Sequence, residues 1–244
     1  MLDKQHPRYQ SLVMRNKLVK GIELGIVHPS GLISHGRGEA FDYLLSEKTH
    51  EFAKKAVDAA VALTLLSNYP VFSVNGNVAA LIPEELRKIN RECSINIEIN
   101  LFHRTNERIF KIKKFLQEHG VLVINKRNSP LVDIRVIKSD RAIVCKNGIY
   151  AADTVIIPLE DGDRANALKS LGKKIIAIDL NPLSRTAKMA DITIVDNICR
   201  CISIFVNRYK VLKNVPRQKL QKIAESFDNA KNLWLAEKQI RKLQ

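Results

Sequence analysis

The chain has 244 residues, 45% of them hydrophobic, which is enough to bury a substantial core and excludes disorder throughout. Its formal net charge of +15 indicates anionic partners, such as nucleic acid, an acidic membrane surface or phosphorylated small molecules. No apolar run is long enough to span a bilayer and the polar start lacks a secretion signal, so we expect a cytoplasmic protein.

The N-terminal portion, about residues 1–69, reads as mostly helical. Residues 11–20 predict a short helix with Gly21 near its end, and residues 51–66 predict a longer, alanine-rich one. Between them, residues 31–39 are dense in glycine and charge. Taken alone this segment reads as an exposed polar loop, although glycines around Arg37 would also let a phosphate approach the backbone and the guanidinium.

From about residue 70 the pattern changes to apolar, β-branched runs that alternate with helical stretches. Thr105 and Asp163 suit helix N-caps, and Gly120 and Gly172 suit the position just past a helix end. The alternation predicts an α/β fold with a largely parallel sheet. The expected strands are 71–74, 95–99, 121–124, 142–144, 154–157, 175–178 and 192–195, and the expected helices are 83–92, 105–119 and 163–171.

Small polar residues follow several of the expected strands. In open α/β sheets, ligands bind beyond the carboxyl ends of the strands, so these segments should meet along one edge and form a site. Each segment also has a simpler interpretation as a turn or a helix cap. The segments are 75–77, 100–105, 160–164, 179–186 and 196–197.

Other motifs are weaker or missing. Glu160, Asp161 and Asp163 could hold Mg²⁺ or orient an amine, but acids in the first turn of a helix explain them equally simply. The sequence has neither a G-x-x-x-x-G-K-[ST] loop nor a G-x-G-x-x-G after a strand. Its four cysteines form no Cys-x-x-Cys pair, so we expect ordinary thiols and no protein metal site.

The last part of the chain, residues 214–244, predicts one amphipathic helix after Pro216. Its apolar residues recur in steps of three and four, so the stripe, with Trp234 above all, should be covered by the rest of the protein. We therefore expect a single domain over 1–213, with its sheet core at about 70–213, followed by this helix. The stripe consists of Leu220, Ile223, Phe227, Ala230 and Trp234.

A set of segments that occur in order resembles the archaeal phosphopantothenate synthetases, or 4-phosphopantoate–β-alanine ligases. The resemblance covers about residues 6–205 and is far more specific than any single motif. It implies a Rossmann-like ligase domain, a homodimer, and ATP-dependent condensation of 4-phosphopantoate with β-alanine on the route to coenzyme A. The segments are 31–44, 73–81, 100–108, 148–150, 158–164 and 177–187.

In that family the reaction releases AMP and pyrophosphate through an acyl-adenylate and uses ATP with Mg²⁺. The resemblance implies Arg37 and His35 as catalytic candidates, and Asn75, Asn77 and Arg104 as substrate-binding candidates. The implied nucleotide contacts are Arg15, Arg37, Asp179, Leu180, Asn181, Arg185, Thr186, Asn197 and Ile198.

Two other classes of protein stay open. One is a small-molecule kinase or phosphotransferase with the same nucleotide site, which would release ADP instead of AMP. The other is a basic nucleic-acid-binding protein, but aromatic residues make up only 6% and no base-stacking motif occurs. We therefore expect small-molecule substrates as partners, and neither nucleic acid nor a membrane.

Overall fold

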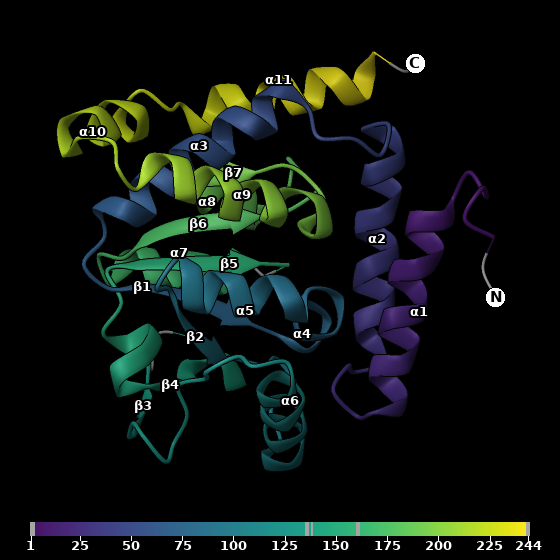
Figure 1. Cartoon of the computed structure of the whole chain (residues 1–244), viewed down its shortest axis with the longest axis vertical. Coiled ribbons are helices and arrows are strands. Elements are labelled where there is room, and N and C mark those ends of the chain that lie inside the picture. Colours follow the sequence, from purple (N-terminus) through teal and green to yellow (C-terminus); the bar gives the residue numbers. More distant parts are fainter. Residues whose placement is uncertain (1–2, 135–136, 138, 160–161, 243–244) are drawn as a thin grey trace.

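The computed structural model describes residues 3–134, 137, 139–159 and 162–242. Figure 1 shows a central sheet with α1 and α2 standing beside the carboxyl ends of its strands. The five strands are all parallel and run in the order β2-β1-β5-β6-β7, which confirms the predicted α/β fold. They are β1 (Pro70–Val74), β2 (Asn96–Ile99), β5 (Thr154–Pro158), β6 (Lys174–Ile178) and β7 (Ile192–Ile194).

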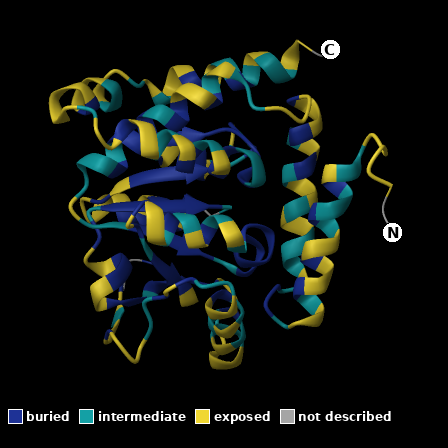
Figure 2. Cartoon of the chain, in the orientation of Figure 1, coloured by how far each residue is buried: buried dark blue, intermediate teal, exposed yellow. Residues whose placement is uncertain are grey.

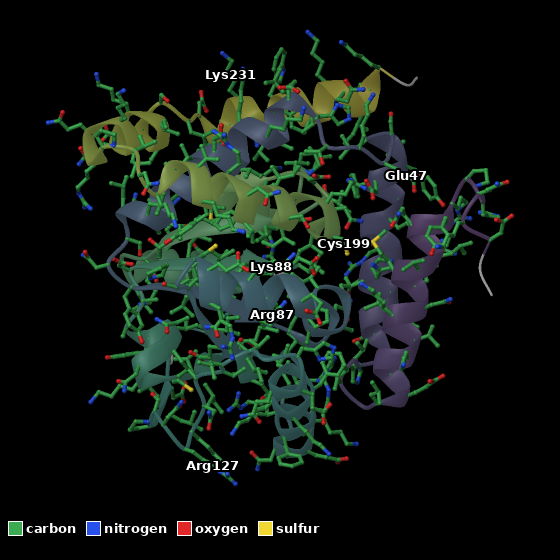
Figure 3. All side chains as sticks on the ribbon, viewed as in Figure 1. Glu47, Arg87, Lys88, Arg127, Cys199 and Lys231 are labelled. Atoms are coloured by element: carbon green, nitrogen blue, oxygen red, sulfur yellow. The ribbon has the colours of Figure 1, made fainter. Side chains whose placement is uncertain are left out.

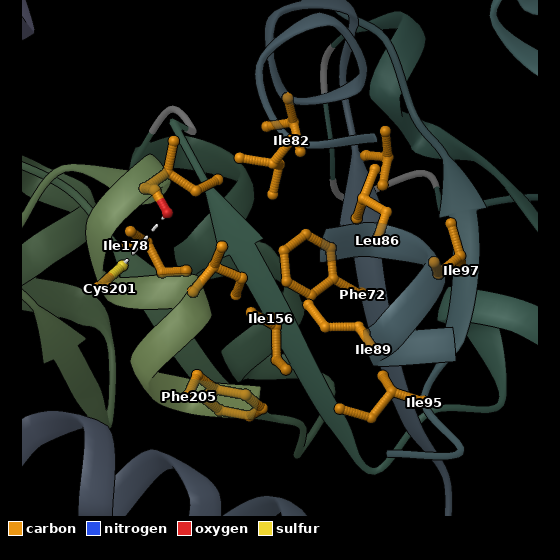
Figure 4. Close-up of a cluster of buried hydrophobic side chains, with 14 of the residues drawn as sticks. Phe72, Ile82, Leu86, Ile89, Ile95, Ile97, Ile156, Ile178, Cys201 and Phe205 are labelled. Atoms are coloured by element: carbon orange, nitrogen blue, oxygen red, sulfur yellow. Dashed lines mark hydrogen bonds between the residues drawn. The ribbon is translucent and has the colours of Figure 1, made fainter. Parts of the chain in front are cut away.

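β5 and β6 are nearly continuous apolar runs because both faces of the sheet are covered. Phe72, Ile156 and Ile178 belong to the larger core cluster on one face (Figure 4), whereas Val71 and Val155 belong to a second cluster on the other. Figure 2 shows the strands of the central sheet buried over most of their length and the helices with exposed outer faces. Burial on both sides is typical of parallel sheets and explains why β5 and β6 do not alternate between apolar and polar residues.

Several helix predictions are confirmed. α3 (Glu51–Leu66) and α5 (Pro83–Glu92) have the predicted bounds, and α6 (Asn106–Glu118) is capped by Thr105, whose side chain accepts a hydrogen bond from Arg108 N. Gly120 and Gly172 have φ values of 75° and 78°, the left-handed conformation that favours glycine after a helix. Two further helices that were not predicted are α4 (Gly76–Leu81) and α9 (Ile198–Leu212).

The prediction of an exposed loop over residues 31–39 is wrong, because this segment forms the middle of α2 (Ser30–Leu44). Contacts with the rest of the chain outweigh the low helix propensity of its glycines. α1 (Tyr9–Glu23) also extends beyond the prediction: Gly21 lies inside it, where a Cβ would come within 2.5 Å of Val27 Cγ2.

The predicted strand at 121–124 is also wrong, since only an isolated bridge joins Ile124 to Glu98. Residues 142–144 do lie at a strand, β4 (Ile143–Cys145), but it pairs antiparallel with β3 (Leu131–Asp133) in a separate two-stranded sheet. A 3-10 turn, η1 (Asp140–Ala142), and a π-helical segment, η2 (Lys146–Tyr150), flank β4. Together residues 131–134 and 139–150 form a small lobe at the edge of the main sheet (Figure 1).

One smaller correction concerns the helix start after β5. Asp163 is not an N-cap, because α7 (Gly162–Ser170) already includes it. The short helix α8 (Arg185–Met189) follows β6 and is capped by Ser184, whose side chain accepts a hydrogen bond from Ala187 N.

The single helix predicted for residues 214–244 is instead two helices, α10 (Arg217–Glu225) and α11 (Asn229–Arg241), because Asp228 caps a new helix. Because of this break, the apolar residues of α10 and α11 do not lie on one continuous face. Leu220 is buried as expected, but Trp234 is 54% exposed, which contradicts its predicted burial. No helix in the described part of the chain has both the length and the apolar character needed to cross a membrane.

α11 is attached to the edge strand β7 mainly through two asparagines. Asn229 Oδ1 accepts a hydrogen bond from Thr193 N at 2.8 Å, and Asn232 Nδ2 donates to Thr193 O at 2.8 Å. Asn229 also donates to the carbonyls of Ala187 and Ala190 at the end of α8. The helix thus satisfies backbone groups that an uncovered edge strand would expose.

Candidate functional site

A cavity of about 780 Å³ lies at the carboxyl ends of the strands, between the loops that follow them and α2. The order of the strands reverses between β1 and β5, which is where ligands bind in open α/β sheets. The predicted convergence is confirmed for the loops after β1, β2, β5 and β6. The predicted site residues that line this cavity are His35, Arg37, Asn75, Asn77, Asp179, Leu180, Asn181, Arg185 and Thr186.

α2 forms one wall of the cavity and is held close to the loop after β1. Asn77 Nδ2 donates a hydrogen bond to Gly31 O at 2.9 Å. A Cβ at Gly31 would lie only 2.3 Å from Asn77 Oδ1, so only glycine allows this approach. The contact fixes the start of α2 over the β1 loop and directs its following residues along the cavity.

His35 and Arg37 are the cavity residues of α2 that can act on a ligand. His35 Nε2 is buried and has no hydrogen-bond partner among the described residues, and burial lowers the pKa of this imidazole. Arg37 is exposed, and its Nη2 donates only a long hydrogen bond of 3.4 Å to Ser34 Oγ. Both groups therefore have hydrogen-bonding capacity that a bound ligand could use.

Asn75 connects the two strands at the point where the strand order reverses. Its Oδ1 accepts a hydrogen bond from Val78 N, which caps α4, and its Nδ2 donates to the carbonyls of Pro158 and Leu159 after β5. With both ends of its amide engaged, Asn75 shapes the floor of the cavity more than it offers free groups to a ligand.

The turn after β6 is held by its own side chains. Asp179 Oδ1 accepts a hydrogen bond from Asn181 N at 2.9 Å, and Oδ2 accepts one from Ser184 Oγ at 2.5 Å. Burial raises the pKa of Asp179, although these hydrogen bonds and the positive charge of Arg37 oppose that rise. The nucleotide loop implied by the resemblance is therefore ordered by internal contacts.

Arg185 and Thr186 begin α8, next to the start of α7. A Cβ at Gly162 would lie 2.3 Å from Arg185 Cβ, so the two helix starts are in close contact. Arg185 Nη1 lies 2.9 Å from Asp163 Oδ1, but both side chains are largely exposed, so this ion pair is weak. The Arg185 guanidinium is thus available at the cavity wall, while Thr186 is buried.

Four predicted site residues lie outside this cavity. Arg15 donates from Nη2 to Glu39 at 2.6 Å, which raises the pKa of this arginine. Arg104 donates from its backbone N to Asp140 Oδ2 at 3.2 Å. Asn197 lines a neighbouring cavity of about 450 Å³, and Ile198 is buried in the core.

Asn197 belongs to a network that joins α2 to α9. Its Nδ2 donates to Asp42 Oδ2 at 3.1 Å, and Arg200 forms ion pairs at 2.6 Å with both Asp42 and Asp196. Asp196 Oδ2 also accepts a hydrogen bond from Thr49 Oγ1. This network fixes the distance between α2 and the carboxyl end of β7, at the side of the cavity nearest to Asp179.

Sequence reasoning missed several residues of the cavity. His28 lies between α1 and α2, His103 follows β2, and Arg108 lies in the first turn of α6. His103 falls inside the polar segment that follows the predicted strand 95–99, so that segment was the available signal. No sequence pattern indicated His28, because only the fold brings the first helices to the ends of the strands. The other polar residues missed are Ser30, Ser34, Arg141 and Ser184.

The donor set fits an elongated anion better than a resident metal. Arg37, Arg185 and Arg108 line the cavity, and His35 contributes a buried unpaired nitrogen. Within the described ranges, no three or more histidine, cysteine or acidic side chains gather as metal ligands. Two carboxylates of the predicted acidic segment, Glu160 and Asp161, lie outside the described residues.

Known proteins match the chain over most of its length. A family model described as phosphopantothenate/pantothenate synthetase matches residues 52–243. A 4-phosphopantoate–beta-alanine ligase of Thermococcus kodakarensis is 47% identical over 232 residues, which cover 95% of this chain and 89% of the relative. Ligases of the same name from Methanospirillum hungatei (48% identical; 83% and 82% covered) and Methanosarcina mazei (44%; 93% and 89%) are similar to it as well.

Proposed function

The chain belongs to the phosphopantothenate/pantothenate synthetase family, and from that premise we propose that it is a ligase that condenses 4-phosphopantoate with β-alanine to 4′-phosphopantothenate. The product is a precursor of coenzyme A. The observation that carries this proposal is one cavity, at the reversal of strand order, whose wall combines arginines from four different elements. Both the phosphorylated acid and a nucleotide are anions, so a single site for both requires such a wall.

ATP is the second substrate in this proposal. The carboxylate of 4-phosphopantoate attacks the α-phosphorus of ATP, a new P–O bond forms, and the bond to pyrophosphate breaks. The amine of β-alanine then attacks the acyl carbon of the adenylate, the bond to AMP breaks, and the amine loses a proton. Neither step needs an enzyme nucleophile, so the protein contributes alignment and stabilisation of charge.

The described residues divide between these tasks. Arg37 and Arg185 stabilise negative charge on the nucleotide phosphates, and Asp179 and Asn181 contact its ribose or base. His35, kept neutral by its lowered pKa, offers a nitrogen to the reacting groups. The other contacts that the family resemblance implies on the nucleotide side are Arg15, Leu180, Thr186, Asn197 and Ile198.

Asn77 lines the cavity between the loops after β2 and β6, which supports it as a substrate contact, whereas Asn75, whose amide is engaged at both ends, would shape the floor beneath the acid. Arg104 lies outside the cavity lining and has weaker support. Mg²⁺ would enter with ATP, supported mainly by phosphate oxygens and water, and would neutralise charge on the leaving pyrophosphate.

The proposal extends to assembly and location. A homodimer is supported by exposed apolar side chains on α2, namely Ile33, Tyr43 and Leu44, whose burial by a partner would be favourable. Light scattering coupled to gel filtration would measure the mass in solution. A cytoplasmic location follows from the substrates, which are intermediates of metabolism inside the cell.

Incubation with ATP, Mg²⁺, 4-phosphopantoate and β-alanine, followed by identification of all products, tests the function. We expect AMP, pyrophosphate and 4′-phosphopantothenate, and AMP formation only when the acid is present. ADP in place of AMP would assign the site to phosphoryl transfer and refute the adenylate route.

A further inference from the structure

One end of the cavity carries a cluster of basic side chains that the nucleotide does not account for. We call His28, His103 and Arg108 the basic corner. They come from two distant parts of the sequence: His28 from the connection between α1 and α2, and His103 and Arg108 from the loop after β2 and the first turn of α6 that follows it. The rings of His28 and His103 stack with centroids 4.0 Å apart and an interplanar angle of 26°.

Arg108 has no acidic partner among the described residues. Its Nη2 donates to Ile26 O at 3.1 Å and its Nη1 donates to His103 O, both of them backbone carbonyls. Its Nε is buried without a hydrogen bond, and burial lowers the pKa of the guanidinium. A half-buried cation with neutral partners only is costly unless an anion approaches it.

His28 presents its second ring nitrogen in the same place. Ser30 N donates to His28 Nδ1 at 3.2 Å, so Nε2 carries the proton of the neutral ring, and no described residue accepts it. Burial lowers the pKa of His28, and the nearby charges of His103 and Arg108 lower it further. The three basic groups therefore repel one another when charged, and an anion would remove that repulsion.

Two acidic side chains that lie close to the loop after β2 and the start of α6 are already engaged elsewhere. Glu107 pairs with Lys111 at 2.6 Å on the surface of α6, and Asp140 Oδ2 accepts a hydrogen bond from Arg104 N. No ion pair to the basic corner occurs in the part of the chain that the structure describes. The protein thus leaves this corner without a counter-charge of its own.

The basic corner lies at the opposite end of the cavity from the predicted nucleotide contacts. It follows β2, whereas Asp179 and Arg185 follow β6, and three strand-to-strand steps separate these two strands. At about 4.8 Å per step this corresponds to roughly 14 Å. Asn75 and Asn77, after β1, lie between the two ends. A second anionic group, other than the nucleotide's own phosphates, can therefore occupy the basic corner.

We propose that His28, His103 and Arg108 bind the phosphate of the phosphorylated acid and so discriminate it from the same acid without phosphate. This inference rests on the proposed function. A phosphate monoester carries close to two negative charges and three acceptor oxygens at neutral pH, which matches two imidazole donors and one guanidinium. The carboxylate of the acid would then extend past Asn77 toward the nucleotide.

The test compares two acids, 4-phosphopantoate and pantoate, in the wild-type protein and in Arg108→Gln. We expect kcat/KM for 4-phosphopantoate to fall roughly 10- to 100-fold in the variant, the range for losing a hydrogen-bonded charge pair. The value for pantoate and the KM for ATP should stay near those of the wild type. Because pantoate lacks only the phosphate, a general folding defect would lower kcat/KM for both acids by the same factor.

Arg87→Gln is the matched control. Arg87 lies on the exposed surface of α5, away from the cavity (Figure 3), and its removal changes the net charge by the same amount. Arg87→Gln should leave kcat/KM unchanged for both acids. His28→Asn is a second variant, which removes one proposed phosphate donor and leaves the contacts of Arg108 in place. It should lower the ratio of kcat/KM for 4-phosphopantoate to kcat/KM for pantoate, as Arg108→Gln does.

The outcomes separate the two proposals. If the wild-type protein forms no AMP with either acid, the proposed function fails. If the wild type is active but Arg108→Gln loses activity equally with both acids, or His28→Asn leaves the ratio unchanged, the basic corner is not the phosphate site. Should pantoate turn over too slowly to measure, calorimetric binding of 4-phosphopantoate without ATP decides instead: equal affinity in wild type and Arg108→Gln overturns the inference.

Discussion

At the scale of single residues, Arg37 is the clearest candidate for an effect on turnover. It lies on the cavity face of α2 and makes only a long hydrogen bond to Ser34. Arg37→Ala should lower kcat by about 100-fold, as expected for losing one charge-stabilising donor. The melting temperature should not change, because the side chain is exposed. Steady-state kinetics with Arg87→Ala as control would check this, and near-normal turnover in Arg37→Ala would remove it from the site.

Glu98 links stability to pH. Its Oε1 and Oε2 accept hydrogen bonds from Cys145 N and Ile149 N, and burial nevertheless raises its pKa from 4.5 to about 7. Between these values the folded chain holds the proton more tightly than the unfolded chain. The unfolding free energy should therefore fall as pH rises through this window, by on the order of 3 kcal/mol at most.

The variant Glu98→Gln isolates this effect, since glutamine does not titrate. We expect it to destabilise the protein more at about pH 5 than at about pH 8, because only the wild type gains from protonation at the lower pH. Urea unfolding at both pH values measures the difference. Glu118→Gln, at an exposed position of α6, is the surface control, and a pH-independent penalty for Glu98→Gln would contradict the prediction.

At the scale of elements, the glycines of α2 provide a matched pair of variants. A Cβ at Gly36 would meet nothing within 4 Å, whereas one at Gly31 would collide with Asn77 Oδ1. Gly36→Ala should therefore raise the unfolding free energy by about 0.5–1 kcal/mol, and Gly31→Ala should lower it. Chemical denaturation checks both signs, and equal effects of the two variants would show that α2 does not pack as described.

The C-terminal helices should stabilise the fold without taking part in the chemistry. Leu220 of α10 is 5% exposed, and Asn229 and Asn232 of α11 satisfy the edge of β7. A chain that ends at Asn214 should melt at a lower temperature and still form the same nucleotide product. An intact melting temperature together with lost affinity for polynucleotide would instead identify these helices as a nucleic-acid-binding arm.

Whether an element can be predicted from the sequence depends on whether its own residues or its contacts with other elements determine it. α3 and α5 were predictable because their own periodicity, and Pro83 at the first position of α5, define them. α2 was not, because its glycines are tolerated only through contacts such as Asn77 with Gly31. Trp234 was misplaced for a similar reason: Asp228 starts a new helix, and a local stripe cannot show which face a later helix presents.

At the scale of the whole molecule, the cavity residues that follow the strands could be predicted from the sequence. His28, in the connection between α1 and α2, could not. Polar segments after strands, such as Asp179 and its neighbours, mark one edge of any parallel sheet. His28 reaches the same cavity only because α1 and α2 lie across that edge (Figure 1), and Arg108 reaches it from the first turn of α6. Half of the site therefore depends on tertiary packing, which motif spacing does not encode.

The pairing of β1 with β5 also determines the order in which the molecule can fold. β5 pairs with β6 across a short connection, Thr154 with Lys174, and β1 pairs with β2 across a similar one, Val71 with Asn96. By contrast, β1 meets β5 through Pro70 and Thr154, which requires closing a long loop at a higher entropic cost. We expect pulse-labelled amides of β6 to gain protection from hydrogen exchange before those that join β1 to β5. Since the cavity spans that junction, a chain caught midway through folding would have two ordered halves and no site between them.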